Sequence, residues 1–109
     1  MDGTGKNVCL RIYVGEDKRH RDKPLYEAIV LKARQARLAG ATVVRGTLGC
    51  GRSIRLPTTG LLFPEVPPVI VEIVDSEDRI MNFVLAGLGE IDLVTCNEVR
   101  VLPCPAIPA

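Results

Sequence analysis

The chain has 109 residues, of which 25% are charged, and its formal net charge is only +1. Its length indicates one domain, and a charge so close to zero excludes binding to DNA or RNA through a concentrated basic face. No run reaches the roughly 18–20 apolar residues that cross a bilayer, and the N-terminus lacks the pattern of a signal peptide, so we expect a cytoplasmic protein without direct membrane insertion.

The first half of the chain predicts a strand, a charged loop and a helix. Residues 8–14 alternate apolar and other side chains, which favours a strand that ends at Gly15. The charged loop 16–23 follows, and Pro24 is expected at the first helical position. Gly40 is the expected glycine stop of the helix. The apolar face at helical spacing comprises Leu25, Ala28, Ile29, Ala33 and Ala36.

The second half predicts two strands, a helix and a last strand. Residues 42–48 and 68–74 are strands, and the proline-punctuated loop 52–67 connects them. Asp75 or Ser76 caps the next helix, and residues 90–101 form the final strand region. The expected buried face of the second helix comprises Ile80, Phe83, Val84 and Leu88.

This order is β-α-β-β-α-β, which predicts an α+β, ferredoxin-like fold with both helices on one face of an antiparallel sheet. Residues 1–7 are an N-terminal tail, 8–102 the domain, and 103–109 a proline-rich C-terminal tail. Because hydrophobic residues make up 47% of so short a chain, the bare sheet face is expected to be covered by other copies of the chain.

Five sequence words together resemble a PII-like family of small trimeric proteins, the domain of unknown function one-ninety. They are LRIYVGED at 10–17, KPLYEAIV at 23–30, LAGATVVRG at 38–46, GCG at 49–51 and VEIVDS at 71–76. The resemblance spans residues 8–102 and implies the fold of PII signalling proteins. Those are homotrimers that bind adenine nucleotides between subunits and signal through the loop between their second and third strands.

The resemblance also implies site residues. Thr42 matches the threonine that approaches adenine, and Gly49, Gly51 and Arg52 match the segment that faces phosphates. Arg100 on the last strand matches a basic position. On the loop, signalling or modification is expected at Ser53, Arg55, Thr58 and Thr59. The chain departs from PII after its third strand, where the acidic residues 75–78 replace a glycine- and lysine-containing phosphate loop and would repel a triphosphate.

Most of these features also have plainer interpretations. Gly49–Gly51 could be a strand-ending turn, and Arg52 and Arg55 could be solvated loop charges. The basic cluster 18–23 is either a solvated loop or a surface for an acidic partner or a phosphate. Arg45, inside a strand, is expected to pair with a carboxylate such as Glu72.

Catalytic and metal sites have little support. The single histidine, His20, has no second ligand pattern or triad around it, and Glu16, Asp17 and Glu27 are expected to be solvated at the surface. The cysteines show no close pairing, so neither a disulfide nor zinc is expected. Cys9 and Cys96 are expected to be buried, and Cys50 is the one candidate for a reactive thiol.

Three functions remain in order of preference. The first is a non-enzymatic PII-like regulator that binds a small anion, in particular an adenine nucleotide, in the clefts of a homotrimer. The second is a structural or partner-binding module without a small ligand that docks on a target protein or a membrane channel, and it is motivated by the acidic residues 75–78 in place of the phosphate loop. The resemblance implies a fluoride-exporting channel as one such partner, because members of that family are often encoded beside, or fused to, one. The third is an enzyme, which would need a nucleophile–base pair that the sequence does not show.

Overall fold

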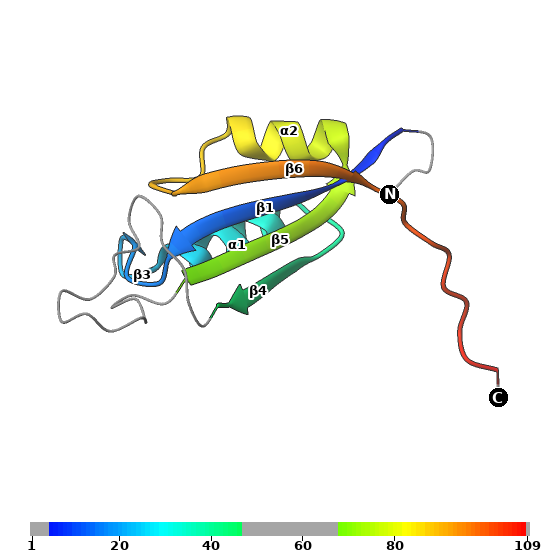
Figure 1. The fold of residues 1–109 in the computed structure, drawn as a ribbon, viewed down its shortest axis with the longest axis horizontal. Coiled ribbons are helices and arrows are strands. Elements are labelled where there is room, and N and C mark those ends of the chain that lie inside the picture. Colours follow the sequence, from blue (N-terminus) through cyan, green and yellow to red (C-terminus); the bar gives the residue numbers. More distant parts are fainter. Residues whose placement is uncertain (1–4, 47–67, 109) are drawn as a thin grey trace.

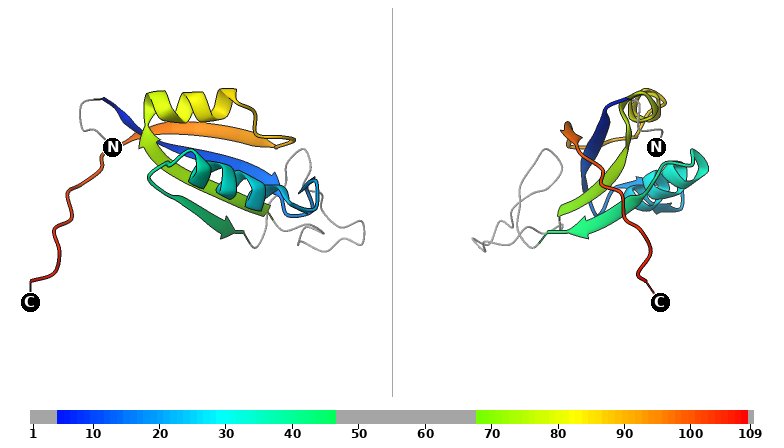
Figure 2. Two further views of the ribbon diagram at one scale, coloured as in Figure 1. Left: turned by 180° about the vertical axis from the view of Figure 1, so that it is seen from behind. Right: turned by 90° about the vertical axis from the view of Figure 1, so that its right-hand side faces the viewer.

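The computed structural model describes residues 5–46 and 68–108 (Figure 1). Its elements in chain order are β1 (Asn7–Gly15), β2 (Arg19–His20), β3 (Lys23–Pro24), α1 (Leu25–Gln35), β4 (Ala41–Arg45), β5 (Pro68–Ser76), α2 (Glu77–Leu85) and β6 (Leu93–Val99). Four strands form one antiparallel sheet in the order β4-β5-β1-β6. Both helices lie on the same face of it (Figure 2), which confirms the ferredoxin-like α+β fold.

The two central strands, β1 and β5, build the sheet side of the core. They pair over their full lengths, from Asn7 opposite Ser76 to Gly15 opposite Pro68. Successive side chains of a strand point to opposite faces, and every second residue of both strands is buried under the helices. These core residues are Val8, Leu10, Ile12 and Val14 of β1, and Val69, Val71 and Ile73 of β5. Burying each one stabilises the fold by about 1.5–3 kcal/mol.

The helices supply the other half of the core through a few residues at helical spacing. In α1 these are Leu25, Ile29 and Ala33, as expected, whereas Ala36 is exposed. In α2, Ile80 and Phe83 are buried, and Leu88 joins them from the segment after the helix. Their spacing of three or four residues puts them on the face toward the sheet.

The ends of α1 differ from the prediction. Pro24 lies at the N-cap, with φ −58° and ψ 141°, so the helix begins one residue later at Leu25. At the other end, the left-handed residue is Arg37, with φ 57°, rather than Gly40. The Arg37 N–H bonds to the Arg34 carbonyl at 3.0 Å, and the Leu38 N–H bonds to the Ala33 carbonyl at 3.1 Å. This pair of bonds is a Schellman motif, which stops the helix three residues before the expected glycine.

The charged loop 16–23 contains an element that the sequence did not reveal. Arg19 and His20 pair with Pro24 and Lys23 in a hairpin of two-residue strands, β2 and β3. The Arg19 guanidinium bonds to the Asp22 carbonyl at 2.7 Å across the turn. Arg21 in this turn has φ 58°, in the left-handed region that favours glycine or asparagine. Segments this short carry no apolar alternation, so pattern reading could not detect them.

The last strand, β6, forms one edge of the sheet and is shorter than the predicted region 90–101. Cys96 on this strand is exposed, contrary to expectation, because β6 has a neighbour on one side only, whereas Cys9 on central β1 is buried. Residues 100–108 then extend away from the domain (Figure 1), and they are exposed throughout.

Candidate functional site

The connection between β4 and β5 leaves the sheet at Gly46 and rejoins it at Pro68, and these two residues are in contact. Gly46 follows β4 and its N–H donates to the Pro68 carbonyl at 2.8 Å. A Cβ on residue 46 would lie 2.7 Å from Cγ of Pro68, so only glycine fits here without a shift. Residues 47–67, called the insertion below, therefore start and finish at one closed base, formed by Gly46 and Pro68. Connections in compact domains have a median of about 4–6 residues, and long ones often carry function.

Arg45 fastens this base to the start of α1 and the end of β1. Its Nη2 and Nε atoms lie 2.8 and 2.9 Å from Oε1 of Glu16. Its Nη2 also donates to the Tyr26 hydroxyl at 3.1 Å, and the guanidinium lies 5.6 Å from the centroid of that ring. The hydrogen bond to Glu16 and the charge of Glu16 raise the pKa of Arg45. The charge of Arg45 is thus already balanced, which suits an anchor better than an anion ligand.

The expected pairing of Arg45 with Glu72 is wrong. Arg45 is opposite Val69 of β5, whose side chain faces the helices, whereas Glu72 lies on the other face of the sheet. Glu72 instead has its carboxylate 3.8 Å from Nε of Arg11 on β1. The prediction placed Arg45 and Glu72 on neighbouring strands, which is correct. However, Glu72 is three positions away from Val69, the residue opposite Arg45, and an odd offset puts the two side chains on opposite faces of the sheet.

Thr42 lies on the sheet face opposite the one that α1 and α2 cover. It is exposed, and it stands opposite Glu72 in a row that continues with Arg11 and Thr95. Arg11 also donates to Oδ1 of Asn97 at 2.8 Å. The row is polar and its one acid is paired with its one base, so Thr42 offers a hydroxyl in a nearly neutral setting.

Arg100 is not brought near Thr42 within one subunit. Thr42 is on β4, at one edge of the sheet, and Arg100 follows β6, at the opposite edge. The two edge strands are three inter-strand spacings apart, which is a distance of about 14 Å. A site that used both residues would need Arg100 from a neighbouring subunit.

The remaining expected site residues lie outside the described residues. They are Gly49, Gly51 and Arg52 of the ligand set, Ser53, Arg55, Thr58 and Thr59 of the loop set, and Cys50. Of the expected ligand set, the structure therefore places Thr42 and Arg100.

The acidic segment 75–78 has an internal structural role that sequence reading missed. Asp75 is fully buried, and its carboxylate accepts hydrogen bonds from the Ser76 N–H at 2.6 Å and the Ala39 N–H at 2.8 Å. Arg79 lies 3.2 Å from the same carboxylate and also donates to the carbonyls of Ala36 and Arg37. The spacing of four residues between Asp75 and Arg79 was the available signal.

Two further classes of site were sought among the described residues. Within residues 5–46 and 68–108, no group of three or more His, Cys, Asp or Glu side chains could hold a metal ion. Over the same ranges, neither helix has the length and apolar character needed to cross a membrane.

Comparison with known proteins adds a family and a relative. The model of the family DUF190, described as "Uncharacterized ACR", matches residues 7–101. A UPF0166 protein of Aquifex aeolicus (strain VF5) is 33% identical over 99 residues, which covers 89% of this chain and 94% of that protein.

Proposed function

The chain belongs to the DUF190 family, which is uncharacterised, and we propose that it is a non-enzymatic regulatory protein. It binds a small anionic ligand, in particular an adenine nucleotide, in clefts between the subunits of a homotrimer. The ligand orders the loop 52–67, and the loop then contacts a target protein. The observation that carries this proposal is the closed base of the insertion, formed by Gly46, Pro68 and the Glu16–Arg45–Tyr26 cluster.

The base supports signalling because it holds the two ends of the insertion together. Arg45 joins β4 to Glu16, which follows β1, and to Tyr26 of α1, so a change in the insertion would be felt by these neighbouring elements. A ligand that binds the ordered insertion better than other conformations then shifts the population toward it. The free energy available for this shift is the difference in binding free energy between the two conformations, less the free-energy cost of ordering the loop.

The uncovered sheet face supports assembly. One row across it is apolar, formed by Val44, Ile70, Tyr13 and Leu93 from the four strands. Val44 and Leu93, at the two edges, are 42% and 54% exposed in the single chain. Association through this face would remove the row from water, and it would bring the β4 edge of one subunit toward the β6 edge of another. Arg100 of a neighbour could then reach the Thr42 side.

Calorimetry on the full chain with AMP, ADP, ATP and cyclic AMP tests the nucleotide claim. Thr42→Val keeps the shape of the side chain and removes its hydroxyl, so it should weaken binding about fivefold. Ser76→Ala is the control, because it removes a hydroxyl that caps no helix, and it does so at the end of β5, outside the two edge strands that carry Thr42 and precede Arg100. No heat from any nucleotide while light scattering shows an intact assembly would disprove nucleotide binding.

A docking module without a small ligand is the second candidate. It is favoured by the charges of the described part of the site, where Arg45 is balanced by Glu16 and Glu72 stands beside Thr42. In this case the insertion binds a target protein or a membrane channel directly. A pull-down that requires residues 52–67, but neither Arg52 nor any nucleotide, would support it over the regulator.

A further inference from the structure

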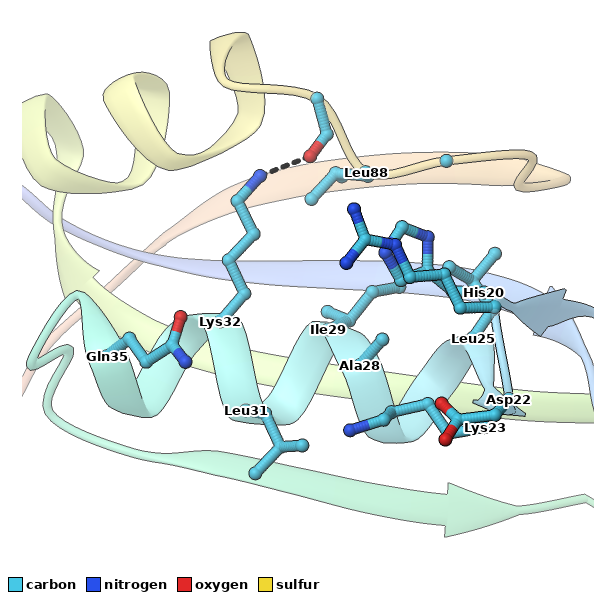
Figure 3. Close-up of a pocket in the computed structure, with 13 residues that line it drawn as sticks. His20, Asp22, Lys23, Leu25, Ala28, Ile29, Leu31, Lys32, Gln35 and Leu88 are labelled. Atoms are coloured by element: carbon cyan, nitrogen blue, oxygen red, sulfur yellow. Dashed lines mark hydrogen bonds between the residues drawn. The ribbon is translucent and has the colours of Figure 1, made fainter.

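A cavity of about 450 Å³ lies on the helix side of the molecule, away from the uncovered sheet face (Figure 3). It is bounded by the β2–β3 hairpin, by α1 along its length, and by the segment Gly87–Gly89 that follows α2. Cavities of roughly 300–1,000 Å³ hold small organic ligands. None of the residues of the proposed regulatory site lines it, so it is a separate feature.

The floor of this cavity is apolar. Leu25 and Ile29 of α1 and Leu88 from the opposite side are buried side chains that line it, with Ala28 between them. These residues belong to the domain core and hold their places without a ligand. The floor therefore offers a preformed apolar contact surface for a compact carbon framework.

The rim is cationic. Arg21 and Lys23 of the hairpin and Lys32 of α1 line the cavity with His20, against one acid, Asp22. The four ion pairs found within residues 5–46 and 68–108 join other side chains and leave Arg21 and Lys23 without a carboxylate partner. Two guanidinium or ammonium groups held near an apolar floor attract an anion more strongly than they would in open water.

Lys32 has a fixed position in this rim. Its Nζ donates to the Gly87 carbonyl (Figure 3), and it lies 5.0 Å from the centroid of the Phe83 ring. Gly87 has φ 99°, and nothing lies within 4 Å of the place where its Cβ would be. The backbone at Gly87 is thus open on that side, and a ligand group could approach it and the ammonium together.

We propose that this cavity binds a small organic anion, in which a phosphate or carboxylate meets Arg21 and Lys32 and a compact apolar body rests on Leu25, Ile29 and Leu88. In this proposal Arg21 of the β2–β3 hairpin binds the anion, whereas in a solvated loop it would contact only water. The proposal does not depend on subunit clefts or on residues 47–67, so it stands or fails separately from the regulatory function.

Phenyl phosphate is the probe, because it carries both a dianion and a ring. It is titrated into the full chain and followed by residue-resolved amide NMR. We expect saturable shifts centred on Ala28, Ile29, Leu88 and Gly89, with at least tenfold tighter binding than inorganic phosphate or benzyl alcohol. Those two compounds each lack one half of the probe. A parallel titration with benzoate, which carries a carboxylate in place of the phosphate, shows which of the two anions the cavity prefers.

Two matched variants connect the binding to the cavity. Arg21→Asn removes a charge from the rim and keeps a residue that tolerates the left-handed backbone, so it should weaken binding five- to tenfold. Arg37→Asn removes the same charge from the same backbone conformation at the far end of α1, and it should leave binding unchanged. Absence of saturable shifts at the cavity, equal binding of inorganic phosphate, or equal effects of the two variants would each overturn the proposal.

Discussion

At the scale of single residues, two arginines occupy backbone conformations that suit glycine. Arg21 and Arg37 have φ of 58° and 57°, and a left-handed conformation costs a side-chain-bearing residue about 1–2 kcal/mol. At Arg37 the surrounding bonds explain the geometry, because the Schellman motif at the end of α1 demands it. The domain tolerates this strain, and Arg37 is therefore a position where stability can be gained.

Arg37→Gly should stabilise the domain by about 1 kcal/mol, because glycine adopts the left-handed conformation without strain. Urea unfolding of both proteins at one equal concentration measures the change. Arg34→Gly is the control, since Arg34 lies within the last turn of α1 and glycine there should destabilise by about 0.5–1 kcal/mol. Destabilisation by Arg37→Gly would show that the arginine side chain contributes more than its backbone costs.

The thiol of Cys96 offers a second residue-scale prediction, on pH. Although Cys96 is an exposed residue, some desolvation of its thiol by neighbouring atoms, and then the charges of Glu77 and Cys9, raise the pKa of Cys96. Because the thiolate is the nucleophile, iodoacetamide labelling of Cys96 should be slow at neutral pH and should rise as pH increases. Glu77→Gln lowers this pKa and should speed labelling roughly two- to threefold at fixed pH.

Mass spectrometry of the Cys96 peptide follows this labelling separately from the other cysteines. Asp78→Asn, one residue along the same helical turn, is the control and should leave the rate unchanged, because Asp78 is not among the causes of the shift. An equal acceleration in both variants would argue that helix fraying, rather than the charge of Glu77, sets the reactivity.

At the scale of elements, one buried carboxylate joins two junctions. Asp75, at the passage from β5 to α2, holds the segment between α1 and β4 through the Ala39 N–H. Arg79 of α2 then reaches the carbonyls at the end of α1. The two helices are thus tied at one end of the sheet, as Lys32 and the Gly87 carbonyl tie them farther along.

Asp75→Asn should destabilise the domain by about 1.5–3 kcal/mol, because a charge-assisted set of hydrogen bonds is lost in a buried place. Thermal or urea unfolding measures this. Asp78→Asn, which changes an exposed carboxylate in the first turn of α2, should cost less than about 1 kcal/mol. Equal costs would mean that Asp75 acts only through the dipole of α2.

At the scale of the whole molecule, the two faces of the sheet differ in what covers them. The helices cover one face and bury the side chains that the central strands β1 and β5 point toward it. The other face keeps an apolar row that neither helix covers (Figure 2). Exposed apolar surface that forms a continuous patch commonly marks an interface. This asymmetry and the resemblance to PII proteins support the proposed homotrimer.

Ile70→Glu should convert the assembly into single chains, because it places a charge at the centre of the apolar row. Light scattering should show the mass fall from about three times 11.8 kDa to the mass of one chain. Leu85→Glu is the control, since Leu85 is 78% exposed on α2, on the covered side of the sheet. A single-chain mass for the unaltered protein, or dissociation by Leu85→Glu alone, would contradict the proposed interface.

Sequence patterns determined the two helices, the four strands of the main sheet and their order, but not the β2–β3 hairpin. The alternation in β1 and β5 and the helical spacing in α1 and α2 are local signals, so they could be read without knowing what each element contacts. From the order β-α-β-β-α-β the fold class followed. The site was predicted less completely, because Thr42 and Arg100 came from a resemblance and most of the other expected residues lie outside the described residues.

Only the tertiary structure decided which side chains meet. Arg45 selects Glu16 over Glu72 because strand register assigns each residue to one face, and periodicity alone does not fix register between strands. The Asp75 carboxylate accepts a hydrogen bond from the Ala39 N–H, 36 positions away in the chain, and Lys32 donates one to the Gly87 carbonyl, 55 positions away. Such contacts arise from the packing of elements on the sheet, and the cavity beside Lys32 exists for the same reason.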